Sequence, residues 1–275
     1  MNKPNVLYAL ITRQCNLTCP HCDVYGITDN YDKEKFIKQL LNFDGEIIIF
    51  GGEPTMYQNR LFDIIDICDS ANKKVRSIST NLTVLNERLI DLYKKIGGVA
   101  TSWNPYRFDN IQYETWHHNC NHLARATGVK PTLLITLDND LLSMGVDKFL
   151  NVVDDWDSSM FKVIKLELYN GDTTPEYFER VDNFLCEVYT KWRSDIPTDL
   201  YDKVNKWWHD CSGVYTLNPD GTMERGCPHN MKPTVPSECY TCERANVCRP
   251  CVLQRYCSFP KKLASIIENR NNGGK

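Results

Sequence analysis

Residues 6–22 read VLYALITRQCNLTCPHC, an apolar segment followed at once by three closely spaced cysteines. The apolar part, Val6–Thr12, has the length and composition of a buried strand. Cys15, Cys19 and Cys22 are then separated by three and two residues, so one loop supplies three thiols. Thiolates are the normal iron ligands of iron–sulfur clusters. Three of them on one loop would leave the fourth iron of a 4Fe–4S cluster open to a small chelating molecule.

The cysteine content indicates the same kind of chemistry. The chain has 275 residues, thirteen of them cysteine, a formal net charge of −3 and a pI near 6.1. It has no long apolar run and no secretory signal, so we expect a cytoplasmic protein without a membrane partner. Many thiols in a reducing compartment indicate metal, and the mildly acidic balance makes nucleic acid an unlikely partner. A zinc site made of the loop cysteines and His21 is the alternative to iron.

Strand-like and helical segments alternate along the first two thirds of the chain. The predicted strands are Val6–Thr12, Glu46–Phe50, Val75–Ser79, Gly98–Trp103, Val129–Leu137 and Phe161–Tyr169. The predicted helices lie at 31–42, 59–72, 86–96, 111–127, 146–154 and 176–193. This order predicts an α/β fold with a parallel sheet, in which ligands bind beyond the carboxyl ends of the strands. Ile47–Ile49 has the pattern of a strand covered on both faces, and Cys68 that of a core residue on a helix.

Polar motifs do follow three further strands. Gly51-Gly52-Glu53-Pro54 follows the second strand, Ser79-Thr80-Asn81 ends the third, and Ser102 ends the fourth. Glycines let a backbone approach a ligand closely, and a carboxylate favours an ammonium group. The sequence therefore places candidate ligand-binding residues at the same edge of the sheet as the cysteine loop.

These motifs together resemble the signature of the radical S-adenosylmethionine (SAM) superfamily. The resemblance covers residues 5–193 and implies a partial (β/α)6 TIM-like barrel, with a SAM-binding [4Fe-4S] cluster on the three loop cysteines. It also implies that Gly51-Gly52-Glu53-Pro54 contacts the SAM amino group, that Ser79-Thr80-Asn81 lies near its carboxylate and ribose, and that Ser102 is a further polar contact. The chain departs from the pattern at Leu82, where glycine is common, and at His21, where tyrosine is usual.

The last part of the chain has a different composition, because proline, glycine and cysteine replace helical periodicity after about residue 195. We expect two domains, residues 1–195 and a small, irregular, cysteine-rich domain at 196–275. Cys211, Gly221 and Cys227, followed by Cys239, Cys242, Cys248, Cys251 and Cys257, resemble the SPASM extension of peptide-modifying radical SAM enzymes, with two spacings changed by one residue and a short final gap.

The SPASM resemblance implies one or two auxiliary [4Fe-4S] clusters. The implied ligands are Cys239, Cys242, Cys248 and Cys257 for one cluster, and Cys211, Cys227 and Cys251 for the other. Zinc ribbons are the alternative for this segment, because pairs of Cys-x2-Cys also suit tetrahedral zinc.

The implied activity is that of a radical SAM oxidoreductase. Reductive cleavage of SAM gives a 5′-deoxyadenosyl radical, which removes hydrogen from a peptide or protein substrate. The auxiliary clusters then assist an oxidative change such as crosslinking or dehydrogenation. An external electron donor such as flavodoxin or ferredoxin is a further implied partner. Two alternatives stay open: a radical SAM enzyme acting on a small molecule or nucleotide, and a non-catalytic zinc-binding module.

Overall fold

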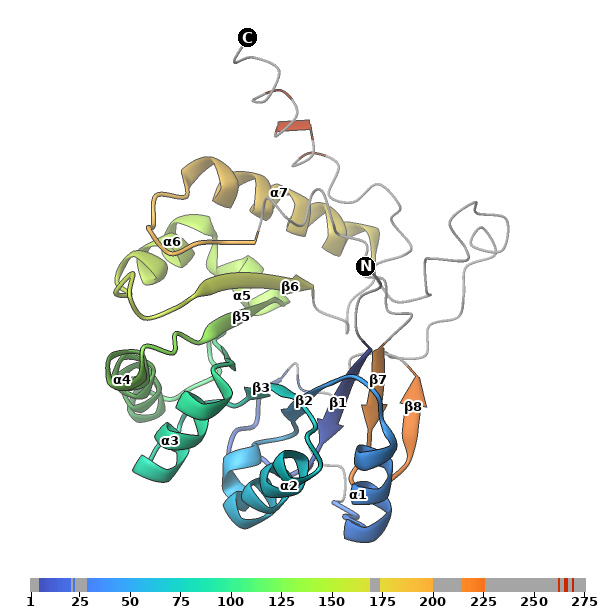
Figure 1. Cartoon of the computed structure of the whole chain (residues 1–275). Helices are drawn as coiled ribbons and strands as arrows, with labels where there is room; N and C mark the ends of the chain where they lie inside the picture. The colour runs from blue at the N-terminus through green and yellow to red at the C-terminus, as the bar shows by residue number, and fades with distance from the viewer. Residues whose placement is uncertain are drawn as a thin grey trace. The chain divides into compact units, whose positions relative to one another are not determined.

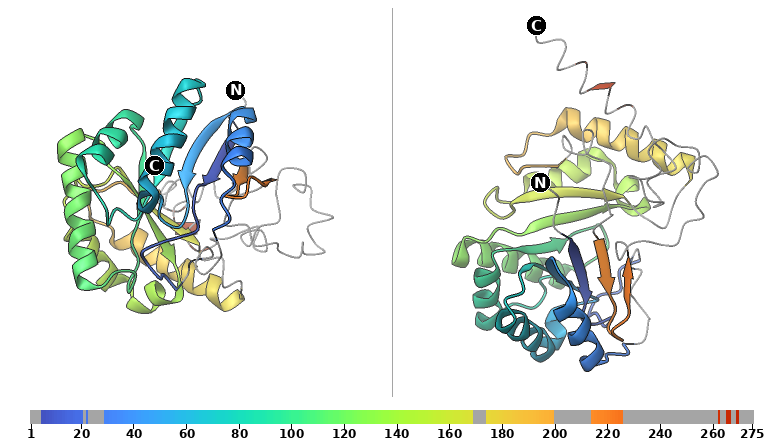
Figure 2. Two further views of the ribbon diagram at one scale, coloured as in Figure 1. Left: turned by 90° about the horizontal axis from the view of Figure 1, so that it is seen from below. Right: turned by 45° about the vertical axis from the view of Figure 1, so that its right-hand side comes forward.

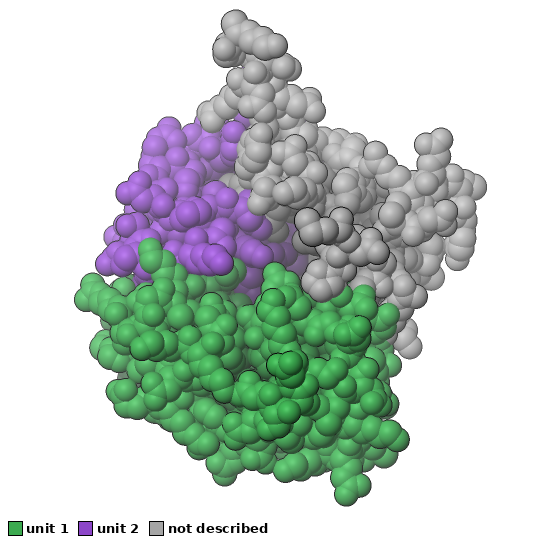
Figure 3. Space-filling model, viewed as in Figure 1, with its two compact units in different colours: residues 1–102, 106–132, 211–229 green, residues 103–105, 133–210, 230–275 purple. Residues whose placement is uncertain are grey.

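The computed structural model describes residues 5–20, 22, 29–168, 174–199 and 214–225, together with positions 262, 265, 266 and 269. His21 and the seven C-terminal cysteines lie outside the described residues, so the predictions made for them stay predictions. The chain forms two compact units, which Figure 3 shows in different colours. The first unit comprises residues 1–102, 106–132 and 211–229, and the second comprises residues 103–105, 133–210 and 230–275.

The first unit is built on a mostly parallel sheet (Figure 1). Its strands are β1 (Val6–Leu10), β2 (Glu46–Phe50), β3 (Val75–Ser79), β4 (Val99–Ser102), β7 (Val214–Leu217) and β8 (Met223–Arg225). They are arranged in the order β4-β3-β2-β1-β7-β8. All neighbouring pairs are parallel except β7 and β8, which are antiparallel. The carboxyl ends of β1 to β4 therefore meet at one edge, as the alternation in the sequence predicts.

Apolar side chains of β1 and β2 supply the centre of this sheet. Leu7, Ala9, Ile47 and Ile49 are fully buried, whereas Ile48 is only half-buried. The strand is therefore covered more completely on one face than on the other. Because successive side chains of a strand point to opposite faces, the two buried isoleucines share one face and Ile48 lies on the other.

The helices of the first unit follow its strands. They are α1 (Lys33–Asn42), the short 3-10 helix η1 (Pro54–Tyr57), α2 (Gln58–Ser70), α3 (Glu87–Ile96) and α4 (Asn110–Thr127). Asp32, Asn86 and Asp109 begin α1, α3 and α4, each accepting a hydrogen bond from a backbone N–H of the first turn. Helices α1, α2 and α3 lie along one side of the strands (Figures 1 and 2). Cys68 on α2 is fully buried, as predicted.

The second unit contains the neighbouring strands β5 (Thr132–Leu137) and β6 (Val163–Leu168). Its helices are α5 (Asn139–Met144), α6 (Val146–Asp154) and α7 (Pro175–Lys191). The Tyr177 hydroxyl on α7 donates to the Leu137 carbonyl at 2.8 Å and so fixes the helix to the end of β5. In the described part of the chain, no helix has the combination of length and apolarity that a membrane crossing requires.

A hairpin late in the first unit was not predicted. Strands β7 and β8 form a hairpin within the segment expected to be irregular, and β7 pairs in parallel with β1. The tight turn between them is Asn218-Pro219-Asp220-Gly221, with Gly221 at φ 81°. Asn, Pro, Asp and Gly in this order are strong turn-forming residues, so the hairpin had a signal in the sequence. The division at residue 195 stays a prediction.

Candidate functional site

The cysteine loop begins at the carboxyl edge of the first unit's sheet. The backbone N–H of Ile11 donates to the Phe50 carbonyl at 3.0 Å, so the chain is still paired with β2 just before the loop. Cys19 is buried, Cys15 and Cys22 are half-buried, and all three are free thiols. The Cys22 N–H donates to the Cys19 carbonyl at 3.1 Å, which makes a turn between the last two cysteines.

The surroundings of the thiols act on their pKa in opposite directions. Burial raises the pKa of Cys15 and of Cys19 above the ordinary value of 9.0. The N–H of Leu17, which donates to Cys15 Sγ at 3.4 Å, lowers the pKa of Cys15. The positive charge of Arg107 lowers the pKa of both cysteines. Since iron binds thiolates, this guanidinium favours the form of the loop that a metal requires.

The donor set of the loop fits an iron–sulfur cluster. Each iron at a corner of a cubane takes its own thiolate, so three cysteines serve one cluster without converging on a single point. Within the described ranges, no three His, Cys, Asp or Glu side chains gather closely enough to hold one metal ion. Cys15, Cys19 and Cys22 would hold three irons and leave the fourth to a small ligand, as the sequence predicts.

The two glycines of the Gly-Gly-Glu segment lie against the start of this loop. A Cβ atom added to Gly51 would lie 2.5 Å from the Thr12 carbonyl oxygen, and one added to Gly52 would lie 2.2 Å from the Gln14 carbonyl oxygen. The same two oxygens accept hydrogen bonds from the N–H groups of Gly52 and Glu53 at 2.8 and 2.7 Å. The sequence suggested that these glycines admit a ligand. In the structure, the absence of a side chain at both glycines allows the backbone of the cysteine loop to approach closely.

Glu53 joins the ends of β2 and β3. Its carboxylate is fully buried and accepts four hydrogen bonds. One oxygen accepts from the Thr55 N–H (3.0 Å), the Thr55 hydroxyl (2.6 Å) and the Thr80 hydroxyl (2.8 Å). The other accepts from the Asn81 N–H at 2.6 Å. Pro54, the first residue of η1, is buried beside it. Glu53 and Thr80 thus organise the strand ends, and contact with SAM stays a prediction for both.

Asn81 extends from the end of β3 to the cysteine loop. Its amide nitrogen donates to Asn16 Oδ1 at 2.7 Å and approaches Cys15 Sγ at 3.9 Å, and its amide oxygen accepts from the N–H and the hydroxyl of Thr83. The side chain predicted to lie near the SAM carboxylate and ribose therefore lies against the first cysteine.

The two remaining predicted contacts lie on neighbouring strands. Ser79 and Ser102 end β3 and β4, and both are half-buried. The Thr80 N–H donates to the Ala100 carbonyl at 2.9 Å, so the ends of the two strands lie side by side. The structure therefore places both serines at the edge from which the cysteine loop begins.

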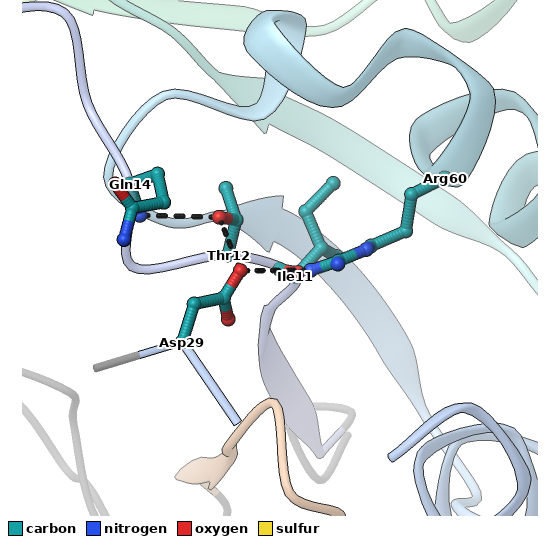
Figure 4. A network of polar contacts seen from close by, with 5 residues as sticks. All are labelled: Ile11, Thr12, Gln14, Asp29 and Arg60. Carbon is teal, nitrogen blue, oxygen red and sulfur yellow. Dashed lines mark hydrogen bonds and ion pairs between the residues drawn. The ribbon is translucent and has the colours of Figure 1, made fainter. Parts of the chain in front are cut away.

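A polar cluster closes the base of the cysteine loop (Figure 4). The Thr12 hydroxyl, before the first cysteine, donates to Asp29 Oδ2 at 2.9 Å, after the last one. Arg60 of α2 donates through one nitrogen to the Ile11 carbonyl at 2.7 Å and to Asp29 Oδ2 at 3.1 Å. The guanidinium also lies 3.8 Å from the centre of the Tyr31 ring, a cation–π contact. Both ends of the loop are therefore fixed to one partly buried ion pair.

Sequence reasoning missed Arg107, Asn16, Asp29 and Arg60, each of which contacts or electrostatically influences the loop. Asn16 lies within the cysteine motif but at a position that its spacing leaves open, and the other three belong to no recognisable motif. Arg107 follows the fourth strand, so its position beyond a strand end was the one available signal. Asp29 and Arg60 are far apart in the sequence, and their pairing depends on the fold.

The fold and the site define an α/β protein with a loop of three free cysteines at the carboxyl ends of parallel strands. Residues 9–105 match the family model of the Radical SAM superfamily, which confirms the resemblance drawn from the motifs. A comparison with curated proteins finds no match.

The structure is similar to solved structures that cover most of its length. A structure of native anSMEcpe with bound AdoMet and Cp18Cys peptide has a TM-score of 0.67 and 16% identity, over 98% of this chain and 99% of that one. Streptococcus suis SuiB bound to S-adenosylmethionine has a TM-score of 0.60 and 12% identity, over 90% of this chain and 72% of that one. SuiB bound to the precursor peptide SuiA has a TM-score of 0.57 and 12% identity, over 82% and 60%.

At such identities the likeness is one of fold. It confirms an α/β fold with a mostly parallel sheet, of the partial TIM-like barrel type.

Proposed function

We propose that this enzyme uses SAM to oxidise a side chain of a peptide or protein. A reduced [4Fe-4S] cluster on the loop would supply the electron that divides SAM into methionine and a 5′-deoxyadenosyl radical, which takes a hydrogen atom from the substrate. The substrate must then lose one electron and one proton to give an oxidised product. The observation that carries the proposal is the placement of three free cysteines beside the Gly-Gly-Glu segment, at the carboxyl edge of the sheet.

The chain's own residues serve this chemistry by holding and orienting the reactants. The Gly51 and Gly52 backbone and the Asp29–Arg60 pair fix the loop that presents the thiols. Ser79 and Ser102, at neighbouring strand ends, would make polar contacts with SAM. An external donor such as flavodoxin or ferredoxin would deliver the electron.

Two observations favour a peptide or protein substrate. Fold relatives are described with a bound peptide, Cp18Cys in anSMEcpe and SuiA in SuiB. The C-terminal cysteines also have a SPASM-like order, which accords with auxiliary [4Fe-4S] clusters that accept the substrate's electron. Cys239, Cys242, Cys248 and Cys257 would hold one such cluster, and Cys211, Cys227 and Cys251 the other.

The first experiment measures 5′-deoxyadenosine formed from SAM by anaerobically reconstituted protein with dithionite. Cys22→Ala should abolish this product because the loop loses an iron ligand. Cys186→Ala is the matched control, because this half-buried free cysteine lies on α7 and outside the loop, and it should retain activity. A Cys22→Ala variant with wild-type yield of 5′-deoxyadenosine would contradict the proposal, as would zinc in place of iron in the wild-type protein.

The second experiment addresses the substrate. Co-expression with candidate peptides, including any short open reading frame beside the gene, should give a peptide that is lighter by two hydrogen masses. Cys242→Ala should still cleave SAM but leave the peptide mass unchanged, because it lacks an auxiliary ligand. Oxidation of a small molecule with no change in any peptide would overturn the peptide assignment and leave SAM cleavage standing.

A further inference from the structure

The side-chain amide of Asn81 has one orientation that the structure allows. Its oxygen faces the backbone N–H of Thr83 at 3.0 Å and the Thr83 hydroxyl at 2.7 Å. A backbone N–H can only donate, so the atom facing it must be the amide oxygen. The NH2 group therefore points the other way, toward Asn16 Oδ1 at 2.7 Å and Cys15 Sγ at 3.9 Å.

Every hydrogen-bonding group of the Asn81 amide also has a partner within the chain. It has two N–H donors and an oxygen with two acceptor positions. One donor is directed at Asn16 and the other at Cys15, and both acceptor positions are occupied by Thr83. The residue is only 3% exposed. A SAM contact through this amide would have to break one of these bonds, whereas a contact with a cluster bound to Cys15 would keep all four.

The backbone around Asn81 is held in place from several sides. The Asn81 N–H donates to Glu53 Oε2 at 2.6 Å, and the Leu82 N–H donates to the Thr80 hydroxyl at 3.1 Å. The Leu82 carbonyl accepts from the Asn119 amide at 2.8 Å. Leu82 itself has φ 53°, a conformation that costs a leucine free energy and persists only where its surroundings enforce it. These contacts fix the direction in which the Asn81 amide points.

We propose that Asn81 is a positioning residue that donates a hydrogen bond to the Cys15 sulfur and thereby raises the reduction potential of the cluster. This inference rests on the proposed function, because it requires a cluster on the loop. The Leu17 N–H, 3.4 Å from the same sulfur, is a second donor. Hydrogen bonds to cluster sulfurs are among the factors that set the potential of iron–sulfur centres. The reduced cluster carries one more negative charge, so it gains more from an N–H donor than the oxidised one does.

The test replaces Asn81 by leucine, which is close in shape and has no N–H donor. In the reconstituted protein, we expect the ratio of reduced to oxidised cluster at a fixed solution potential to fall about tenfold. For a one-electron couple this is a shift of about 59 mV to a more negative potential. The measurement is a redox titration followed by electron paramagnetic resonance, and it requires neither SAM nor substrate.

The matched control is Asn86→Leu. Asn86 belongs to the same unit and caps α3 by accepting from the Leu89 N–H, and its amide donates to Gln58. Loss of this cap should cost about 1 kcal/mol of stability. It should leave the cluster potential unchanged, so it separates general destabilisation from an effect on the sulfur.

A second measurement uses the wild-type protein and does not depend on how well a variant folds. Protein labelled with 15N in asparagine side chains should show a 15N coupling to the reduced cluster in electron–nuclear double resonance. A wild-type cluster without that coupling would overturn the inference, as would an Asn81→Leu cluster with the wild-type potential. In either case the proposed function would stand. Failure of the wild-type loop to bind any [4Fe-4S] cluster would overturn both.

Discussion

Leu82 combines a strained backbone with a buried side chain. Its φ of 53° lies in the left-handed region that favours glycine, and its side chain has 0% exposure. In the radical SAM pattern that the motifs resemble, glycine is common at this position. The turn requires a positive φ, which explains why glycine suits this position. The leucine side chain fills space in the core, which explains how a leucine is tolerated here.

The sizes of two free-energy terms, backbone strain and side-chain packing, predict how Leu82 affects stability. Leu82→Gly should relieve about 1–3 kcal/mol of backbone strain. It should also lose about 2–5 kcal/mol of buried side-chain packing, so we expect a net destabilisation of about 1–3 kcal/mol. Asn72→Gly is the matched control, because Asn72 has φ 57° but is exposed, and it should be neutral or slightly stabilising. Urea denaturation measures both. Equal changes in the free energy of unfolding for Leu82→Gly and Asn72→Gly would show that burial of the Leu82 side chain contributes nothing to stability.

The cysteines of the described part of the chain differ in chemical accessibility. Burial raises the pKa of Cys68 from its ordinary value of 9.0 to about 11, and raises the pKa of Cys120 well above 9.0. Cys15 and Cys22, by contrast, are only half-buried. Since alkylation requires an accessible thiolate, protein without metal should react first at the loop.

At pH 7.5 we expect Cys68 to alkylate at least about 100-fold more slowly than an ordinary thiol, because its pKa is about two units higher. The neutral thiol is the form that the native state favours. The contribution of Cys68 to the free energy of unfolding should therefore be constant below pH 9 and fall as the pH rises from 9 toward 11. Iodoacetamide labelling followed by mass spectrometry measures the rates, with urea-unfolded protein as the reference. Labelling of Cys68 as fast as Cys15 in folded protein would contradict this account.

At the scale of elements, the sequence predicted the regular core of the fold closely. The bounds predicted for β2 and β3 are those observed, and α6 was also predicted as it occurs. These segments have clear periodicity and end at turn-forming residues. Helix α5 was missed because its six residues are too few to show a helical period. The β7–β8 hairpin was missed because its short strands lie in a cysteine-rich context that reads as irregular.

The candidate site was predictable in part for a related reason. Cys15, Cys19, Gly51 and Gly52 occur in local motifs, so their spacing alone indicates their chemistry. The Asp29–Arg60 pair is formed by residues on different elements, and no local pattern encodes a contact of that kind. The sequence therefore indicated the residues of local motifs and not the contacts between residues far apart in the chain.

The Asp29–Arg60 pair at the base of the loop should be worth more than the exposed pair Lys33–Asp63. The side chains of Asp29 and Arg60 are 9% and 19% exposed, against 57% for Asp63 and 59% for Lys33. Asp29→Ala leaves the Arg60 charge largely buried without its partner and should cost about 2–3 kcal/mol. It should also lower the iron bound per chain, because the two ends of the loop separate.

Asp63→Ala is the control for this prediction. It breaks an exposed ion pair between α1 and α2 and should cost less than about 1 kcal/mol, with no loss of iron. Chemical denaturation and iron analysis of both variants give the comparison. An Asp29→Ala protein with full iron content would show that the pair stabilises the unit without fixing the loop.

At the scale of the whole molecule, the chain returns from its C-terminal third to complete the first unit. Strand β7 extends the sheet beside β1, and the hairpin turn contacts the start of α1. The Asp32 N–H donates to the Pro219 carbonyl at 2.9 Å, and the Arg13 guanidinium donates to Asn218 at 3.0 Å. These contacts tie the hairpin to the strand that leads into the cysteine loop, and in the sequence the hairpin lies between Cys211 and Cys227, two proposed auxiliary ligands.

Gly221 is the residue on which this connection depends most. It has φ 81°, and a Cβ atom there would lie 2.4 Å from Lys35 Cβ and 2.9 Å from the Lys35 carbonyl carbon. Gly221→Ala therefore combines backbone strain with a collision against helix α1, and should cost about 2–4 kcal/mol. Gly97→Ala shares the positive φ, at 72°, but has no atom within 4 Å of the added Cβ, so strain alone should cost about 1–2 kcal/mol.

Comparison of Gly221→Ala with Gly97→Ala tests whether the contact between the hairpin turn and α1 holds the hairpin in place. At a temperature where both remain folded, Gly221→Ala should bind less iron than Gly97→Ala. The reason is that the turn lies, in the sequence, between the proposed auxiliary ligands Cys211 and Cys227. Iron analysis and thermal unfolding measure the two quantities. Equal iron content and equal stability in the two variants would mean that the hairpin is held by its β7–β1 pairing alone, with no contribution from its contact with α1.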